Sequence, residues 1–270
     1  MRTALGEAVR RGHLSRNVAA LAKPPSLSDQ AEVEPYSIEE VKRLLETAGE
    51  RRNSARWAIA LALGLRQGEA LGLKWSEVDL DAGTLRVRRG RQRPKYAHDC
   101  GNTCGRKQAG YCPSRIALRP VTAETKSRAG RRGVGLPDEI VALLHKHRIE
   151  QERERELAAQ LWNDEDWLFA MQTGRPVNPN SDYHDWKRLL VRAGIRDGAL
   201  HHARHTAATV LLLLGVPERT VMAIMGWSNS AMAGRYQHVT DVIRRDVAKR
   251  LDGLLWAGEG LAEEDPPASS

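Results

Sequence analysis

Residues 200–209 read L-H-H-A-R-H-T-A-A-T, and an apolar run, residues 210–214, follows directly. His201 and Arg204 are three residues apart, so on a helix their side chains share one face beside a buried stripe. A guanidinium can donate to two phosphate oxygens, and an imidazole can exchange a proton near neutral pH. The stretch therefore predicts a helix that carries part of a site for a phosphate diester. The simpler alternative is that its histidines are solvated helix residues.

Two further candidates lie a short way downstream. Trp227 follows a glycine, and Tyr236 lies in the stretch G-R-Y-Q-H-V, residues 234–239. An indole N–H can donate to a phosphate oxygen, and a phenol can act as a nucleophile. An isolated tyrosine is usually explained as an amphipathic core residue. The spacing of the full set favours a site.

With these residues the chain resembles the tyrosine recombinase, or phage integrase, family, in an actinobacterial-type form with a Cys-containing insertion. The family's H-x-x-R motif corresponds to His201 and Arg204, and its later His-or-Trp and Tyr positions correspond to Trp227 and Tyr236. Two earlier family blocks are similar to G-L-R-Q-G-E-A-L-G-L-K-W, residues 64–75, and T-K-S-R-A-G-R-R-G-V-G-L-P, residues 125–137. The resemblance covers roughly residues 35–250.

The resemblance implies a fold and a reaction. The fold is α+β and mainly α-helical, the DNA breaking-rejoining enzyme fold with a small three-stranded antiparallel sheet. The reaction is site-specific recombination, in which a phage or mobile element integrates or excises through a 3′-phosphotyrosine intermediate. Arg66 and Arg204 would hold the scissile phosphate, Trp227 would pack against it or donate its indole hydrogen, and Tyr236 would attack phosphorus.

The remaining roles implied by the resemblance concern protons and orientation. Lys126 would protonate the departing 5′-oxygen, His201 would assist proton transfer at the tyrosine, and Glu69 would orient its neighbours. Because the phosphotyrosine conserves the bond energy and arginines replace a metal clamp, catalysis would need no cofactor. Two alternatives stay open: type IB topoisomerase-like activity, and a truncated protein that occupies attachment sites without cutting them.

The charge of the chain agrees with a polyanionic partner. It has 42 Lys and Arg against 34 Asp and Glu, a net charge of +8 and a pI near 9.7. Residues 91–132 contain eleven basic residues and only two acidic ones. Such a segment predicts attraction to phosphates and salt-dependent binding. The resemblance implies that the partner is double-stranded DNA at attachment sites. The candidate DNA-binding residues are Arg128, Arg131 and Arg132.

The pattern along the chain predicts its organisation. Residues 1–22 are predicted to form one amphipathic helix and residues 23–35 a linker. By the family resemblance, this helix would be the remnant last helix of an N-terminal core-binding domain. Residues 36–257 would form the catalytic domain, which starts with a capping box of Ser37 and Glu40. Residues 258–270 would be a disordered acidic tail. No apolar run is long enough to span a membrane and no signal peptide is evident, so we expect a cytoplasmic protein at the nucleoid.

Four further features are expected within the catalytic domain. Residues 57–65 should form a buried helix that ends at Arg66, and residues 138–161 one or two helices. Strands are expected over 83–88, 120–125 and 133–136, with 126–132 as a hairpin tip. A helix over residues 241–256 would, by the family resemblance, dock on a neighbouring subunit in a homo-oligomer on DNA, a tetramer. Packing within the same chain is the alternative.

A Cys-containing basic insertion interrupts the domain at residues 91–118. It contains H-D-C-G-N-T-C-G-R-K-Q-A-G-Y-C-P, residues 98–113. His98, Cys100, Cys104 and Cys112 could supply four ligands to one structural Zn²⁺. The spacing C-x3-C-x7-C is loose, so free cysteines in a flexible loop are the alternative. In either case a metal here would be structural and not catalytic.

Overall fold

The structure, a computed structural model, describes residues 1–22, 34–101, 103–125 and 128–228. Lys126, Tyr236 and the predicted helix and tail after it lie outside the described residues. The chain divides into two compact units, Met1–Glu34 and Pro35–Ser270. Each unit is described by itself below. No helix in the described ranges is long and apolar enough to cross a membrane.

The first unit consists of a helix and a following segment that turns back against the start of that helix. α1 (Arg2–Arg10) ends before Gly12, which adopts a left-handed φ of 74°, and a short 3-10 helix, η1 (Val18–Ala20), follows. The Arg2 guanidinium donates to the carbonyl oxygens of Ala19 and Ala22, each at 3.1 Å. The prediction of one continuous helix over residues 2–22 is therefore wrong, because glycine allows a backbone conformation that ends the helix.

The second unit begins with the predicted capping box. The Ser37 hydroxyl accepts from the Glu40 N–H at 3.1 Å, and the Glu40 carboxylate accepts from the Ser37 N–H at 2.7 Å, at the start of α2 (Ile38–Gly49). Two backbone N–H groups at the helix start thereby gain acceptors. The capping-box prediction is confirmed. Leu44 and Ala48 lie on the inner face of α2 and belong to the same buried cluster as Trp186.

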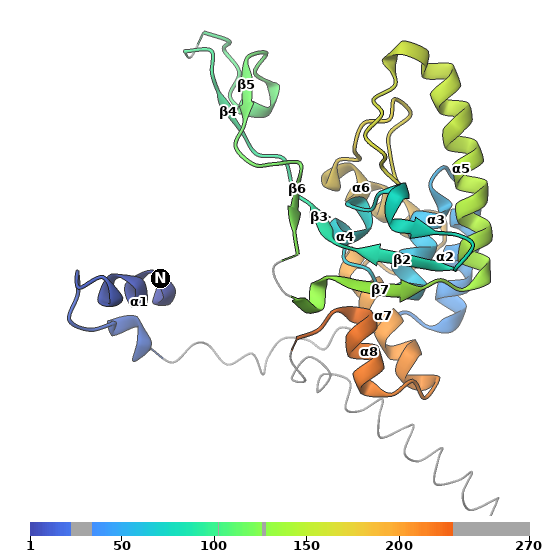
Figure 1. Ribbon diagram of the computed structural model, residues 1–270, viewed down its shortest axis with the longest axis horizontal. Coiled ribbons are helices and arrows are strands. Elements are labelled where there is room, and N and C mark those ends of the chain that lie inside the picture. The colour runs from blue at the N-terminus through green and yellow to red at the C-terminus, as the bar shows by residue number, and fades with distance from the viewer. Residues whose placement is uncertain (23–33, 102, 126–127, 229–270) are drawn as a thin grey trace, which may run out of the picture. The chain divides into compact units, whose positions relative to one another are not determined.

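The other helices follow in chain order (Figure 1). Their bounds are α3 (Ser54–Ala58), η3 (Ile59–Leu63), α4 (Gln67–Leu71), η4 (Trp75–Glu77), α5 (Asp138–Ala158), η7 (Ala159–Leu161), α6 (Pro179–Arg192), α7 (Leu200–Leu213) and α8 (Glu218–Met225). α5 and η7 confirm the helices expected over residues 138–161.

The segment expected as a helix over residues 57–65 is buried, but its form differs. It is α-helical only to Ala58, continues as a π-helical turn over Ile59–Leu63, and ends at Gly64 with a φ of 61°. A Cβ on Gly64 would lie 2.8 Å from the Met225 methyl group. The close approach of α8 therefore requires glycine here, and Arg66 begins the next helix instead of ending this one.

The central sheet has three antiparallel strands, in the order β1 (Val78–Asp79), β2 (Thr84–Val87) and β7 (Arg132–Gly135). Leu85 pairs with Val134, and both side chains enter the main core. The expected small three-stranded sheet is confirmed, but one expected member is wrong. β6 (Thr122–Glu124) pairs with β3 (Arg89–Arg91) in a separate ribbon, because the strand that returns from the insertion pairs with the strand that leads into it.

The insertion continues this ribbon outward. β4 (Tyr96–His98) pairs with β5 (Arg115–Ala117), and the 3-10 helix η5 (Ala109–Tyr111) lies in the loop between them (Figure 1). A further 3-10 helix, η6 (Arg128–Gly130), precedes β7. The insertion is therefore a two-stranded arm whose two ends both join the β3–β6 pair.

Three clusters of buried side chains form the core of the second unit. One lies between the sheet, η3 and α5, the second joins α2, α3, α6 and the start of α7, and the third joins α7 to α8. Together they fix the starts of α4 and α7 and the end of α8. These three helix ends carry the site described next.

Candidate functional site

Arg66 caps the N-terminal end of α4 and is held there by Glu69. The Glu69 carboxylate accepts from the Arg66 backbone N–H at 3.1 Å and from its guanidinium at 2.6 Å. The Arg66 side chain is 42% exposed, whereas that of Glu69 is 6% exposed. The buried carboxylate thus orients a guanidinium whose outer side faces solvent, as binding of an external anion requires.

Arg204 lies on the inner face of α7 and is buried. Its guanidinium donates to the Gly64 carbonyl at 2.5 Å and also to the Met225 carbonyl. The Trp227 ring is buried beside it, with its centroid 5.9 Å from the guanidinium carbon. A guanidinium is planar and has five N–H donors, so these two bonds fix its position and orientation.

The C-terminal end of α8 gathers three guanidiniums. Arg132 donates to the Ile224 carbonyl at 2.6 Å, Arg204 donates to Met225, and Arg66 donates to the Gly226 carbonyl at 3.4 Å. The last carbonyls of a helix lack intrahelical partners and carry the negative end of its dipole. They therefore attract cations, and the cluster of three arginines with the single carboxylate of Glu69 keeps an excess of positive charge. The sequence pattern did not indicate this arrangement.

Arg132 is placed differently from the expectation that it contacts DNA. Its side chain is 7% exposed, and its guanidinium donates to the Glu69 carboxylate at 2.9 Å. Burial by itself raises the pKa of Glu69, but the hydrogen bonds and charges of Arg132 and Arg66 outweigh it and lower that pKa. Arg132 therefore supports the carboxylate that orients Arg66. Arg131, which precedes β7, is exposed, whereas Arg132, the first residue of β7, turns its side chain toward Glu69.

Replacing Glu69 by Gln is expected to lower the free energy of unfolding by about 2 kcal/mol at pH 7, because Arg132 loses its buried counter-charge. Folding lowers the pKa of Glu69, so the ionised carboxylate stabilises the fold above its unfolded-chain pKa of about 4.3. This contribution to stability disappears as the pH falls through the lower pKa that Glu69 has in the folded state.

The difference in stability between wild type and Glu69→Gln should therefore shrink as the pH is lowered below about 4. Urea unfolding at a series of pH values measures it. Glu150→Gln, at a carboxylate that is 52% exposed, is the matched control with little expected change. A difference that stays constant with pH would contradict the role of the Glu69 charge.

The three histidines of α7 occupy different environments. His201 and His205 stack edge to face, with ring centroids 4.8 Å apart, and His201 is exposed. His202 packs against the Tyr36 ring at 6.4 Å, and burial lowers its pKa. The interpretation of all three as solvated residues is wrong for His202. His201 stands on the same helix as Arg204, one turn toward the N-terminus.

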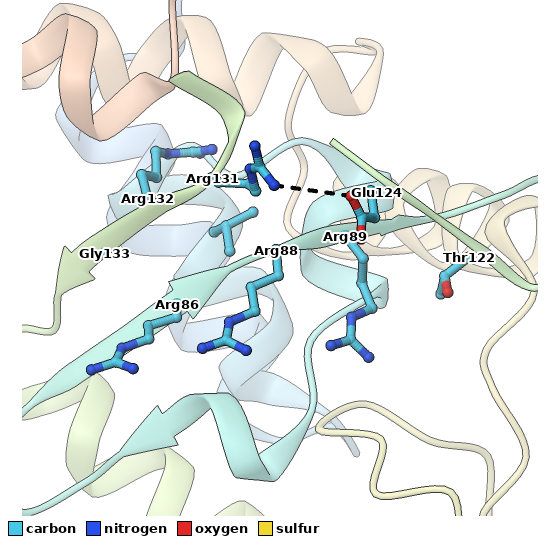
Figure 2. Close-up of a pocket in the computed structure, with 9 residues that line it drawn as sticks. Arg86, Arg88, Arg89, Thr122, Glu124, Arg131, Arg132 and Gly133 are labelled. Carbon is cyan, nitrogen blue, oxygen red and sulfur yellow. Dashed lines mark ion pairs between the residues drawn. The ribbon is translucent and has the colours of Figure 1, made fainter. Parts of the chain in front are cut away.

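A basic groove of about 710 Å³ lies between the two antiparallel pairs β2–β7 and β3–β6. Figure 2 shows Arg86, Arg88 and Arg89 extending to one side of it, with Arg131 on the opposite wall beside Glu124. The Arg131 side chain is 58% exposed, and its ion pair with Glu124 spans 4.0 Å. Arg86 and Arg88 were not predicted as site residues, although alternation along the strand expected over residues 83–88 could have indicated them. Arg128 begins η6, but its side chain lies outside the described residues.

The four insertion residues predicted as metal ligands converge in the arm. The ligand atoms of His98, Cys100, Cys104 and Cys112 all lie within 4.8 Å of one another. His98 Nδ1 is 3.8 Å from Cys100 Sγ and 3.5 Å from Cys104 Sγ. Tetrahedral Zn²⁺ with bonds of about 2.1 and 2.3 Å would separate N and S ligands by about 3.5 Å. The cluster could hold a metal ion.

The thiols of this cluster differ in their readiness to ionise. Hydrogen bonds from the backbone and side chain of Cys104 lower the pKa of Cys100 to about 6. Burial raises the pKa of Cys112. None of the three cysteines forms a disulfide. Since the thiolate is the form that binds metal, the lowered pKa prepares Cys100 to act as a ligand.

Comparison with protein families and curated sequences identifies relatives. A sequence model described as the phage integrase family matches residues 113–242. An integrase of Saccharopolyspora erythraea is 43% identical over 94% of this chain and 65% of its own length. A tyrosine recombinase XerC-like protein of Caldanaerobacter subterraneus subsp. tengcongensis is 30% identical over 94% of this chain and 64% of its own length. The chain thus spans slightly less than two thirds of these relatives.

Solved structures share the fold. The XerA recombinase matches with a TM-score of 0.57 and 23% identity, over 93% of this chain and 76% of that one. The Tn1549 transposon integrase in complex with transposon right end DNA matches with a TM-score of 0.61 and 20% identity over the same shares. At these identities the likeness establishes the architecture of the chain.

Proposed function

Because this chain belongs to the phage integrase family of tyrosine recombinases, we propose that it cuts and rejoins DNA at specific sites through a 3′-phosphotyrosine on Tyr236. The observation that carries the proposal is the gathering of Arg66, Arg204 and Trp227 at the C-terminal end of α8. Two arginines held in place by protein acceptors can bind the non-bridging oxygens of one phosphate. A phosphodiester resists attack mainly through its negative charge, so this clamp lowers the main barrier.

Double-stranded DNA is the proposed substrate. The basic groove offers exposed arginines on both walls, and arginine is a common donor to the phosphates of a duplex. The Tn1549 integrase, which shares the fold, was solved with transposon DNA bound. Arg131 and Arg128, in the segment that precedes β7, are proposed to contact phosphates. Arg132 acts as a positioning residue through Glu69.

In the proposed reaction the Tyr236 hydroxyl oxygen attacks phosphorus and the bond from phosphorus to the 5′-oxygen breaks. His201 helps to remove the phenol proton, and Lys126 delivers a proton to the departing 5′-oxygen. The free 5′-hydroxyl of another strand reverses the step and releases the tyrosine. Each exchange conserves the energy of one phosphodiester, so no nucleotide is needed, and Arg66 and Arg204 take the place of a catalytic metal. Exchange between two duplexes requires paired sites, and we propose a tetramer on DNA.

The arm cluster is proposed to hold a structural Zn²⁺. Three thiolates and one imidazole form a ligand set that zinc prefers, and the positions of the four atoms approach tetrahedral spacing. The arm spans residues 92–121. Among its described residues, Cys112 has the one buried apolar side chain. A two-stranded hairpin without a core is marginal in water, so the metal supplies the missing stabilisation.

The cutting reaction is tested with a large pool of singly nicked, end-labelled duplexes whose randomised sequences present many candidate sites. The full chain should form an adduct with DNA that survives denaturation, and mass spectrometry should locate it on Tyr236. Tyr236→Phe, which removes one oxygen atom, should form none. DNA binding without any adduct would make the chain a non-cutting binder, and an adduct on another residue would contradict the mechanism. Relaxation of supercoiled plasmid without strand exchange between two sites would indicate topoisomerase activity.

A further inference from the structure

The arm has almost no hydrophobic core of its own. Tyr111 is 71% exposed, and Ile116, Leu118 and Val121 are also exposed. The contacts within the arm are mainly strand pairing and the stacking of the Arg115 guanidinium 4.8 Å from the Tyr96 ring centroid. An insertion kept only for stability would bury its apolar side chains. The arm instead presents its side chains outward, which suits a binding surface.

The charge of this surface is strongly one-sided. Six cationic side chains of the arm are exposed, and Asp99 is its one acidic residue. Within the described ranges, none of the six forms an ion pair with a carboxylate. The six are Arg93, Lys95, Arg106, Lys107, Arg115 and Arg119. Unpaired, exposed cations at this density attract a polyanion.

The root of the arm is fixed to the helix that starts with Arg66. β3 packs on α4 so closely that a Cβ on Gly72 would lie 3.1 Å from both the Arg89 carbonyl oxygen and the Arg91 nitrogen. Where the β3–β6 ribbon leads into the arm, the Arg91 guanidinium donates to the Val121 carbonyl at 2.7 Å. Backbone contact without intervening side chains leaves little freedom between the two elements. The arm therefore starts from a rigid position beside the candidate catalytic site.

We propose that the arm is a second DNA-binding element, which grips the phosphates of the duplex outside the cleavage site and needs its metal ion to do so. The inference rests on the proposed function only in taking DNA as the substrate. A two-stranded ribbon is narrow enough for the major groove of B-DNA, and lysine and arginine contacts to phosphate hold its register. The charge favours DNA over a protein partner, for which the exposed apolar side chains would be the main attraction.

The test measures DNA affinity as a function of salt in the full chain carrying Tyr236→Phe, so that cleavage does not interfere. The probe is a fluorescent random-sequence duplex followed by anisotropy. The arm variant combines Arg93→Gln, Lys95→Gln and Arg119→Gln, none of which is a metal ligand. The matched control combines Lys42→Gln, Arg43→Gln and Lys146→Gln, which remove equal charge from exposed positions on α2 and α5.

The arm variant should lower the slope of log affinity against log salt by about 2 to 3, since each lost phosphate contact contributes about 0.9. At about 0.1 M salt the affinity should fall at least 10-fold, whereas the control should change it less than 3-fold. Equal slopes for the two triple variants would overturn the inference. If the parent chain binds no duplex at all, the proposed function fails first, and the two failures are thereby distinguished.

The metal dependence is tested separately by elemental analysis and by Cys112→Ser. The purified chain should contain one zinc per molecule, and Cys112→Ser should lose the zinc and reproduce the reduced salt slope of the arm variant. If a metal-free chain kept the full salt slope, the proposed metal requirement would be wrong. A change in self-association with no change in DNA affinity would assign the arm to a protein partner instead.

Discussion

Replacing Arg204 by Lys is expected to slow formation of the covalent protein–DNA adduct by about 100- to 1,000-fold, the usual cost of one preorganised donor to a developing charge. The guanidinium is buried and held by the Gly64 and Met225 carbonyls. A lysine carries the same charge but has one donor group, so it cannot bond both carbonyls and still reach a phosphate bidentately. The charge alone is not enough to replace the fixed geometry.

The measurement is the single-turnover rate of adduct formation on the nicked duplex, with thermal unfolding of the same sample to show that it is folded. Arg188→Lys is the matched control, because Arg188 is an exposed arginine on α6 paired with Asp185. It should leave the rate within a factor of two. An Arg204→Lys rate within 10-fold of the parent would show that Arg204 does not hold the reacting phosphate.

Replacing Asp182 by Ala is expected to cause the largest loss of stability, about 3 to 5 kcal/mol, because it leaves a buried arginine without its counter-charge. Arg56 on α3 and Asp182 on α6 form a two-bond ion pair at 3.1 and 3.0 Å, and both side chains are nearly inaccessible. The Gln67 amide also donates to Asp182 at 2.9 Å. The pair thus joins two core helices next to the start of α4.

Urea unfolding at pH 7 measures this loss. Glu150→Ala, which breaks an exposed pair with Arg153, should change the free energy of unfolding by less than about 1 kcal/mol. The double variant Arg56→Met, Asp182→Leu removes both charges and should recover most of the loss. If Asp182→Ala cost no more than Glu150→Ala, burial of the pair would not determine its contribution.

Much of the candidate site is recognisable in the amino-acid sequence, because its residues belong to short motifs. Spacing and family resemblance identify Arg66, His201, Arg204 and Trp227, and the structure places Arg66, Arg204 and Trp227 at one helix end. Residue type identifies the four arm ligands, and they lie together. Such motifs can be recognised because their residues are close together in the chain, or because the same spacing recurs throughout one family.

Other features could not be read in this way. The sequence pattern suggested that Arg131 and Arg132 both face DNA, yet Arg132 is buried against Glu69, which lies 63 residues earlier. The partner of β6 was also missed, because alternation shows which face of a strand is buried but not which strand lies beside it. The break of the helix at Gly64 arises from the approach of α8, a contact across the core.

The family, the α+β class, the capping box at Ser37 and the residues able to bind phosphate or metal are all readable in the amino-acid sequence. These follow from local pattern, side-chain chemistry and helix-end signals. The tertiary structure decided which arginines are oriented and which are exposed. It did so because the unpaired carbonyls at the end of α8 need donors, and only the fold brings Arg66, Arg132 and Arg204 from three distant segments to satisfy them.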